Sequence, residues 1–378
     1  MRIILVAIYS HVDGYPPSLN AIYHLSNIFD KIIVLERNYG RSKWEFPSNV
    51  QIVSCNPQVN TSTTEKLSIY KKVSGYVRFA FLLCKILKNE KPDVLLLYDG
   101  IPLALSYFCS IPIKTKLWYH NHDVTHESEL RKYTFRRFLR RFEIRQMQKV
   151  DIFSLPTDSR LQFFPRASGH IKILIVPNYP SRFIYGSWYI NQVFNGIELK
   201  LIHQGAFKPV NFETLLSVFY KIKLPFPLML SIAGPANDVC EAKIKEIKNC
   251  YLSPNKVISL GRIPYNELPL VTREHHVGLA LYSEDNIMVR TIGTASNKIF
   301  EYISLGLPVI FTEREDFRDL FGHYLWAYFV SSDYNNLKEV LSSIFQNYAA
   351  SSAAARRTFL QERNFEIEFD KVIQLLTK

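Results

Sequence analysis

The sequence has no apolar run long enough to cross a membrane. A spanning helix needs about 18 or more consecutive apolar residues, and no stretch of this 378-residue chain approaches that length. The apolar run near its start, Ile3 to Ile8, is followed directly by Ser10, His11 and Asp13. Because a signal peptide needs a basic start, a longer apolar core and a small-residue cleavage site, we expect this run to be a strand. Any membrane contact is then expected to be peripheral.

Cysteine motifs and glycine motifs are missing too. Five cysteines are scattered along the chain, without C-x-x-C spacing: Cys55, Cys84, Cys109, Cys240 and Cys250. Their odd number and irregular spacing predict reduced thiols in a cytosolic protein, and argue against a disulfide framework or a structural zinc. No G-x-G-x-x-G occurs, so the first half is not expected to be a plain dinucleotide-binding domain.

Length and composition indicate a globular protein of two domains. A chain of 378 residues exceeds the usual size of a single core. Hydrophobic residues make up 47% and charged residues 21%, which is typical of a globular rather than a disordered chain. We predict a first domain over 1–180, a second over 199–360, and a terminal helix over 361–378 that packs back on the first.

Short apolar runs alternate with stretches long enough for helices in both halves. In the first half the runs cover 2–7, 31–35, 94–98, 116–119, 152–155 and 171–176. In the second half they cover 199–203, 228–232, 257–260, 277–281, 308–311 and 327–330. Such alternation predicts the α/β class, with two doubly wound, mainly parallel sheets. Ligands of these sheets lie beyond the carboxyl ends of the strands.

The most informative stretch is 297–311, which reads NKIFEYISLGLPVIF. Ile299, Phe300 and Ile303 have the spacing of a helix with one buried face. Gly306 lies where a left-handed helix C-cap is expected, and the apolar residues 309–311 then predict a strand buried on both faces. The stretch is therefore expected to form a helix, a turn and a central strand.

Lys298 and Glu301 are the polar residues of this helix that its apolar face does not explain. The N-terminus of a helix attracts anions because its free N–H groups and its dipole both point outward there. Lys298 and the backbone at Asn297 are suited to a phosphate, and Glu301 is suited to accept hydrogen bonds from a sugar diol. A surface salt bridge on an ordinary helix is the alternative interpretation.

These residues resemble the donor-binding motif of retaining glycosyltransferases of the GT-B fold, family-4 type. The matching pattern S-N-K-x-F-E-Y consists of Ser296, Asn297, Lys298, Phe300, Glu301 and Tyr302. The family's earlier glutamate falls on Gly293, so the two-glutamate form is absent here. The resemblance implies two Rossmann-like doubly wound parallel-sheet lobes facing a cleft. The nucleotide-sugar donor would lie on the second lobe and the acceptor on the first.

Further segments of the second half resemble the same family. The resemblance implies that Gly205 and Lys208 contact the diphosphate, that Gly234 ends a strand at the donor site, and that Gly261, Arg262 and Ile263 lie near the base. Lys208 and Lys298 would stabilise the leaving diphosphate. Because 204–208 and 296–298 contain no Asp or Glu, we predict that no metal cofactor is required; the nearest acidic loop carries Glu284 and Asp285.

The loop after the run 116–119 reads YHNHDVTHE and is rich in histidine. A metal site, structural histidines and acceptor recognition are all compatible with it. Because the resembled family has a histidine at this strand end, near the reacting hydroxyl, we favour acceptor recognition by His120 or His122. Asp123 could orient either ring through its other nitrogen. Asp13 and Gly14, in the loop after the first strand, are expected on the acceptor side as well.

The segment 131–149 is strongly basic. Eight of its residues are cationic: Arg131, Lys132, Arg136, Arg137, Arg140, Arg141, Arg145 and Lys149. Glu143 is its only acid, so the segment carries most of the chain's formal charge of +12. Phe135, Phe138 and Phe142 follow at helical spacing, which indicates either an anionic membrane surface as partner or a stripe packed on the sheet. Nucleic acid is not expected as a partner, because no recognised motif accompanies the charge.

Together these features predict a glycosyltransferase that moves a hexose from a nucleoside-diphosphate sugar to a glycan or lipid-linked acceptor, with retention. Cell-surface polysaccharide or O-antigen-type synthesis, in the cytoplasm at the inner face of the membrane, is the expected setting. A nucleotide-sugar epimerase of the same fold and a non-catalytic nucleotide-sugar-binding subunit are the alternatives. A transferase is expected to release nucleoside diphosphate only when an acceptor is present, and this dependence distinguishes it from both alternatives.

Overall fold

The computed structural model describes residues 1–12, 16–37, 44–55, 69–124, 135–164, 169–205, 209–235, 238–282 and 287–377. Its contacts divide the chain into two compact units. Unit 1 comprises Met1–Asn178 together with Phe365–Lys378, and unit 2 comprises Tyr179–Asn364. The division therefore falls between Asn178 and Tyr179, close to the predicted end of the first domain, and the end of the chain returns to unit 1.

Unit 1 contains a seven-stranded sheet in the order β3-β2-β1-β4-β5-β6-β7, with every pairing parallel. The strands are β1 (Ile3–Ile8), β2 (Lys31–Glu36), β3 (Val50–Ser54), β4 (Val94–Tyr98), β5 (Lys116–His120), β6 (Ile152–Leu155) and β7 (Lys172–Ile175). In the centre, Ile4 of β1 lies between Ile32 of β2 and Val94 of β4. The sheet order reverses direction at β1 and β4, which is where such folds bind ligands.

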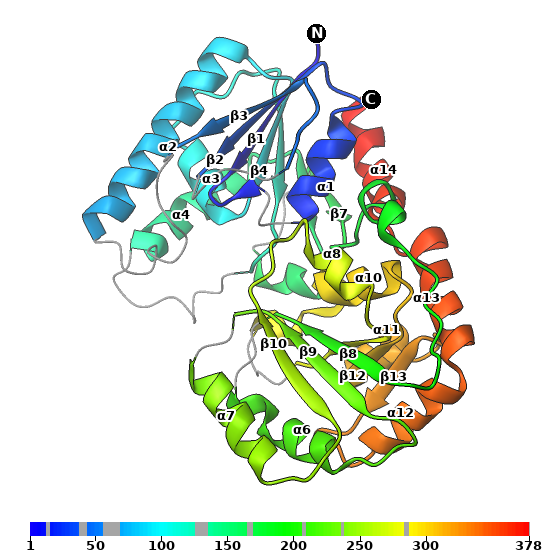
Figure 1. Cartoon of the computed structure of the whole chain (residues 1–378). Coiled ribbons are helices and arrows are strands. Elements are labelled where there is room, and N and C mark those ends of the chain that lie inside the picture. The colour runs from blue at the N-terminus through cyan, green and yellow to red at the C-terminus, as the bar shows by residue number, and fades with distance from the viewer. Residues whose placement is uncertain are drawn as a thin grey trace. The chain divides into compact units, whose positions relative to one another are not determined.

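Helices cover both faces of this sheet (Figure 1). They are α1 (Pro16–Leu25), α2 (Ile69–Glu90), α3 (Gly100–Ser106), α4 (Phe135–Met147) and α14 (Phe365–Thr377). Successive side chains of a strand point to opposite faces. Leu5 accordingly packs in the core beneath α2, α3 and α4, while Val6 packs in the core beneath α1 and α14.

Helix α14 is part of the unit 1 core although it comes last in the sequence. Its Phe369 ring lies 5.7 Å from the ring of Trp118 on β5. Its final carbonyl groups accept hydrogen bonds from unit 1 cations, with Arg2 Nη2 3.0 Å from the oxygen of Leu376 and Lys116 Nζ 3.0 Å from that of Leu375. Cations at a helix C-terminus also stabilise the helix dipole.

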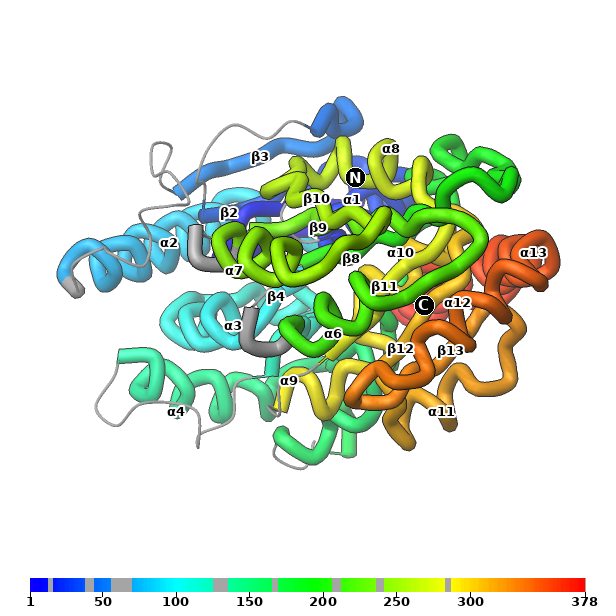
Figure 2. Tube along the Cα trace, turned by 60° about the horizontal axis from the view of Figure 1, so that its bottom comes forward, coloured from blue at the N-terminus to red at the C-terminus, as the bar shows by residue number. Residues whose placement is uncertain are grey.

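Unit 2 contains a six-stranded parallel sheet in the order β10-β9-β8-β11-β12-β13, which can be followed in Figure 2. Its strands are β8 (Leu199–Gln204), β9 (Leu228–Ala233), β10 (Lys256–Gly261), β11 (Val277–Ala280), β12 (Val309–Thr312) and β13 (Ala327–Val330). Its helices are α5 (Arg182–Tyr185), α6 (Pro209–Lys221), α7 (Asp238–Asn249), α8 (Leu268–Thr272), α9 (Ile287–Arg290), α10 (Asn297–Ser304), α11 (Glu315–Phe321), α12 (Leu337–Gln346) and α13 (Tyr348–Gln361). Short 3-10 helices also occur in the described ranges, at Asp158–Phe163 in unit 1 and at Gly186–Trp188 and Gly293–Ala295 in unit 2.

The predicted fold class, two doubly wound parallel sheets, is confirmed, and each apolar run predicted as a strand is one. The sequence prediction missed β3. This strand lies at the edge of the first sheet, and its residues are only partly buried. An edge strand needs no continuous apolar run, so it lacks the signal that identified the others.

The prediction of reduced thiols is wrong for one pair of cysteines. Cys84 of α2 and Cys109, three residues after α3, form a disulfide across a sequence separation of 25. The two residues meet because α2 and α3 pack against each other on one face of the sheet, which no local spacing reveals. Cys55 and Cys250 are free thiols. No helix in the described ranges combines the length and apolarity that crossing a membrane requires.

Candidate functional site

Helix α10 begins and ends as its sequence predicts. The Ser296 side chain caps its start by accepting a hydrogen bond from the backbone N–H of Ile299, and the Tyr282 hydroxyl hydrogen bonds to the same Ser296 oxygen. At the other end Gly306 adopts a φ of +76°, the left-handed conformation that glycine tolerates best. The chain then enters β12, between β11 and β13.

Glu301 is a buried carboxyl group held by two tyrosines. The residue is 5% exposed, and the hydroxyls of Tyr185 and Tyr265 hydrogen bond to it. These two hydroxyl oxygens lie 2.6 Å from each other. Burial raises the pKa of Glu301 to about 7, while the tyrosine hydrogen bonds act in the opposite direction. The carboxylate is thus already arranged to accept two hydroxyl donors, which is what a sugar diol offers.

Lys298 lies one turn away from Glu301 on the same helix and has no acidic partner among the described residues. Its Nζ is 3.4 Å from the carbonyl oxygen of Gln204 at the end of β8 and 4.3 Å from the centre of the Tyr282 ring. Burial lowers the pKa of Lys298 to about 7. A bound anion would take the place of the missing acidic partner and would favour the charged form of Lys298.

Two buried acceptor atoms next to Lys298 have no hydrogen-bond partner in the described part of the chain. They are Oδ1 of Asn297 and Oε1 of Gln204. Buried polar atoms without partners are rare in folded proteins, and each one calls for a ligand, a water molecule or another explanation. The N-terminus of α10 therefore places the Lys298 side chain beside two acceptor atoms that no described group hydrogen bonds.

The glycines predicted at the diphosphate lie side by side at the carboxyl ends of β8 and β9. Gly205 has a φ of +106°, and its N–H donates to the oxygen of Ala233 at 2.9 Å. A Cβ on Gly234 would lie 1.9 Å from the Gly205 oxygen. The absence of a side chain on Gly234 lets the two backbones touch at the edge where a ligand is expected, whereas Gly205 is favoured by its positive φ, since nothing lies within 4 Å of its Cβ position. Lys208 lies outside the described residues.

The residues predicted near the base lie at the end of β10, the edge strand of the sheet, and directly after it. Gly261 has a φ of +65°, Arg262 is exposed and Ile263 is partly buried. From the same turn Tyr265 reaches Glu301, so this turn and α10 belong to one site. Sequence reasoning missed Tyr265, although it follows Ile263 by two residues, and Tyr185, which lies between the two predicted domains.

In unit 1 the histidines at the end of β5 are buried and close to each other. His120 and His122 are each 3% exposed, with ring centres 4.7 Å apart. His120 Nδ1 lies 2.7 Å from Ser154 Oγ, and burial, followed by the nearby His122, lowers the pKa of His120 well below its usual value. His120 is therefore a neutral imidazole near pH 7.

The carboxylate that contacts His122 is Asp99, which sequence reasoning did not single out. Asp99 Oδ2 is 3.6 Å from His122 Nδ1, and Oδ1 accepts the backbone N–H groups of His122 and Asp123 at 2.7 and 3.2 Å. Asp99 has a φ of +64°, which is unusual for a residue with a side chain. Asp13, Gly14 and the last residues of the histidine-rich loop lie outside the described part of the chain. The described ranges contain no cluster of three or more His, Cys, Asp or Glu side chains that could hold a metal ion.

Helix α4 shows that one arginine of the basic segment is buried and so is not available to a membrane surface. Arg140 is 8% exposed, forms an ion pair with Glu143, and lies 5.7 Å from the centre of the Phe164 ring. The only acid of the segment and one of its arginines thus neutralise each other inside unit 1. Arg136, Arg141, Arg145 and Lys149 are exposed, as is Phe138, whereas Arg131 and Lys132 lie outside the described residues.

The comparisons with known proteins concern the whole chain. No protein-family model and no curated protein sequence matches it. Among solved structures, sucrose-phosphate synthase from Thermosynechococcus elongatus is similar with a TM-score of 0.68 at 12% identity, over 100% of this chain and 98% of that one. The glycosyltransferase WaaG, involved in lipopolysaccharide biosynthesis, gives 0.63 at 13% identity over 99% of both chains.

A third similar structure is Anabaena Alr3699/HepE in complex with UDP-glucose, with a TM-score of 0.65 at 12% identity over 100% of both chains. All three resemble this chain from end to end, through both parallel sheets. The chain has the GT-B fold. At identities this low the similarity establishes the fold of the GT-B protein, and its activity is argued below from its own residues.

Proposed function

We propose that this GT-B protein is a glycosyltransferase of the retaining, family-4 type. It would move a hexose from a nucleoside-diphosphate sugar to a glycan or lipid-linked acceptor. The observation that carries the proposal is the pair on α10, next to the glycine turn at the end of β8: Glu301, buried and held by two tyrosines, and Lys298, which has no acidic partner among the described residues. The HepE structure of the same fold is a complex with UDP-glucose, which supports this class of donor.

In this proposal the residues of unit 2 bind and activate the donor. Glu301 accepts the ribose hydroxyls in place of the tyrosine hydroxyls. Lys298, Lys208 and the start of α10 at Asn297 face the diphosphate, and Gly205 and Gly234 allow its close approach. As the glycosidic bond breaks, negative charge grows on the diphosphate, and preformed cations and N–H groups stabilise it without rearrangement. Arg262 and Ile263 lie near the base.

The residues of unit 1 recognise the acceptor in this proposal. The neutral ring of His120 can accept a hydrogen bond from a hydroxyl group, and Asp99 Oδ2 lies 3.6 Å from Nδ1 of His122. With retention, the acceptor hydroxyl attacks the face from which the diphosphate leaves. No side-chain nucleophile is then required, and the departing diphosphate can take up the hydroxyl proton.

We also propose that transfer requires no divalent metal, because Lys298, Lys208 and the start of α10 supply the positive charge at the diphosphate. Turnover in excess EDTA should therefore match turnover in millimolar Mg²⁺ or Mn²⁺. Complete loss in EDTA, restored by metal, would contradict this part of the proposal. Glu284 and Asp285, in a neighbouring loop outside the described residues, would then be the first positions to mutate.

The setting we propose is synthesis of a cell-surface polysaccharide or O-antigen-type glycan at the inner face of the membrane. The exposed cations Arg141, Arg145 and Lys149 and the exposed Phe138 of the basic segment support an anionic membrane surface as partner.

The experiment that tests the proposed function measures release of nucleoside diphosphate from a panel of nucleotide-sugars, with and without glycan and lipid-linked acceptors. Acceptor-dependent release and a glycosylated product by mass spectrometry are expected. Conversion of the donor without acceptor would favour an epimerase. Donor binding without release under any condition would favour a non-catalytic binding subunit.

A further inference from the structure

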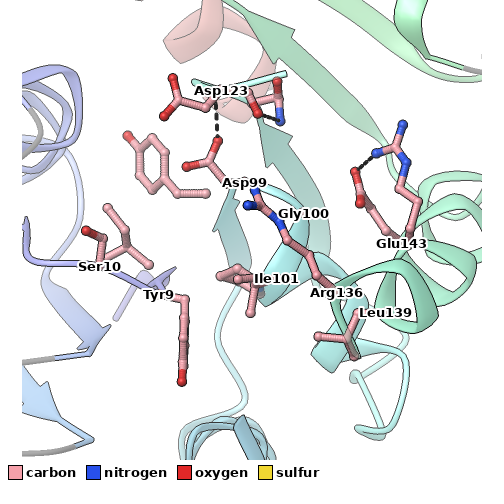
Figure 3. A pocket seen from close by; sticks show the side chains of 14 residues that line it. Tyr9, Ser10, Asp99, Gly100, Ile101, Asp123, Arg136, Leu139 and Glu143 are labelled. Carbon is pink, nitrogen blue, oxygen red and sulfur yellow. Dashed lines mark hydrogen bonds and ion pairs between the residues drawn. The ribbon is translucent and has the colours of Figure 1, made fainter. Parts of the chain in front are cut away.

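Unit 1 contains a small cavity at the point where its sheet order reverses (Figure 3). It is bounded by the carboxyl ends of β1 and β4, the start of α3 and one side of α4, and its volume is about 160 Å³. A cavity of about 150 Å³ is large enough for one six-membered carbon ring, and drug-sized ligands need about 300–1,000 Å³. The cavity therefore fits a single ring and not a longer chain.

The polar wall of the cavity consists mainly of oxygen acceptors. Asp99, Asp123 and Glu143 contribute carboxyl groups, and Asn121 contributes an amide. Asn121 is 2% exposed, and its Oδ1 has no hydrogen-bond partner among the described residues. The nitrogen and oxygen of this amide can be told apart. Nδ2 lies 3.4 Å from the backbone carbonyl oxygen of Asp123, and because that oxygen can only accept a hydrogen bond, the group facing it must be the NH₂. A buried acceptor at the cavity is thus unused.

The charges around the cavity favour a ligand that donates hydrogen bonds. Arg140 neutralises Glu143, and the Tyr119 hydroxyl also donates to Glu143 at 3.2 Å. Burial, followed by the charge of Asp99, raises the pKa of Asp123, although His122, Arg160 and Arg136 act in the opposite direction. A carboxylate or phosphate on the ligand would face Asp99 and Asp123 at short range. Arg160 is near both carboxylates but does not line the cavity. Of the two arginines that line it, Arg140 is paired with Glu143, and Arg136 lies at the exposed side.

Apolar groups complete the wall. Ile101 and Leu139 line the cavity together with Tyr9, and all three are labelled in Figure 3. A sugar ring has this combination of surfaces, since its hydroxyl groups lie around the edge and its C–H groups on the two faces. A ring of this kind can satisfy the oxygen acceptors and cover the apolar side at once.

We propose that this cavity binds one uncharged, hydroxyl-bearing sugar ring, the terminal residue of the acceptor. The inference rests on the proposed function for the identity of the ligand as an acceptor. Ring hydroxyls donate to Asn121 Oδ1 and to the carboxylates of Asp99 and Asp123. The site rejects sugars that carry a phosphate or carboxylate at this position, because it offers acceptors where such groups need donors.

The test is saturation-transfer NMR on the full chain without nucleotide. The probes are methyl α-glucoside, methyl α-galactoside and methyl α-mannoside, compared with glucose 6-phosphate and glucosamine. We expect at least one neutral methyl glycoside to bind, and glucose 6-phosphate to bind at least tenfold more weakly. Absence of binding by all three neutral glycosides, or binding of only the phosphorylated or the amino sugar, would overturn the proposal.

Two variants locate the binding. Asn121→Ala removes the unused acceptor, and Ser10→Phe fills the cavity from the β1 side without touching the buried network of Asn121, Tyr119 and Glu143. Each should weaken glycoside binding at least tenfold, whereas the exposed unit 2 variant Asp319→Asn should not change it. Undiminished binding by a folded Ser10→Phe protein would contradict the assignment, whatever the stability of Asn121→Ala.

A parallel titration with nucleoside diphosphates separates this inference from the proposed function. Nucleotide binding without glycoside binding would overturn the cavity assignment and leave the donor site intact. Glycoside binding without nucleotide binding would support the cavity and contradict the proposed transferase.

Discussion

Gly205 and Gly234 touch backbone to backbone, since a Cβ on Gly234 would come within 1.9 Å of the Gly205 carbonyl oxygen. Gly234→Ala must therefore push the ends of β8 and β9 apart. We expect a loss of about 1–3 kcal/mol in the free energy of unfolding, the usual cost of overpacking, together with at least tenfold weaker nucleotide binding. Gly186→Ala is the control, because nothing lies within 4 Å of its Cβ position. Equal urea midpoints and nucleotide affinities for both variants would contradict this geometry.

Donor binding should be coupled to the protonation of Lys298. Burial lowers the pKa of Lys298 to about 7 in the free protein, so at pH 8 the side chain is mostly neutral. A bound diphosphate raises this pKa, because it favours the charged form. Binding at pH 8 should therefore take up close to one proton, and affinity should fall as the pH rises above 8.

Calorimetry in two buffers of different ionisation enthalpy measures this uptake. At pH 8 Glu301, with a pKa of about 7, is already mostly ionised and contributes little. The variant Lys298→Met keeps the length of the side chain and should abolish the uptake. The same uptake in wild type and Lys298→Met would show that another group takes the proton.

The fold could be predicted from the sequence because its strands are buried on both faces. Continuous apolar runs such as 94–98 and 309–311 identify central parallel strands almost without reference to the rest of the chain. The helix–glycine–strand pattern around Gly306 was predictable for the same reason, since capping is a local property. Strand β3 lies at an edge and half in solvent, and so it left no comparable signal.

The site could be predicted only where its chemistry lies within one short segment. Lys298 and Glu301 belong to one helix and stand out from its apolar face. Tyr185 and Tyr265 reach Glu301 from segments 116 and 36 residues earlier, and nothing in their neighbourhood marks them. Asp99 and the Cys84–Cys109 disulfide likewise depend on which elements become neighbours in unit 1.

Membrane attachment by the basic segment should depend on its exposed cations only. Reversal of Arg141, Arg145 and Lys149 to glutamate should release the protein from anionic vesicles, because each basic residue near such a surface contributes about 1 kcal/mol. Arg140 is left unchanged, since its loss would leave Glu143 buried and unpaired. The matched control reverses the exposed unit 2 residues Lys245, Lys248 and Lys256. Equal co-sedimentation of both triple variants at physiological salt would rule this surface out.

The Cys84–Cys109 disulfide should stabilise unit 1. Closing a loop of this length, with a sequence separation of 25, is worth about 2–4 kcal/mol, mainly by restricting the unfolded chain. The double variant Cys84→Ser/Cys109→Ser should therefore unfold at lower denaturant concentration than wild type, and reductant should remove the difference. The exposed free thiol Cys250 offers a control in Cys250→Ser. Wild-type stability of the double variant without reductant would show that the bond contributes nothing.

The central claim is that the buried carboxylate of Glu301 binds the donor. The most direct measurement is calorimetric titration of wild type and Glu301→Gln with the nucleotide-sugar that binds wild type best, with exposed Glu315→Gln as the matched control. Charge-assisted hydrogen bonds in a closed site are worth about 1.5–3 kcal/mol. Affinity should fall about ten- to hundredfold in Glu301→Gln and stay unchanged in Glu315→Gln. Unchanged affinity in a folded Glu301→Gln protein would contradict the account.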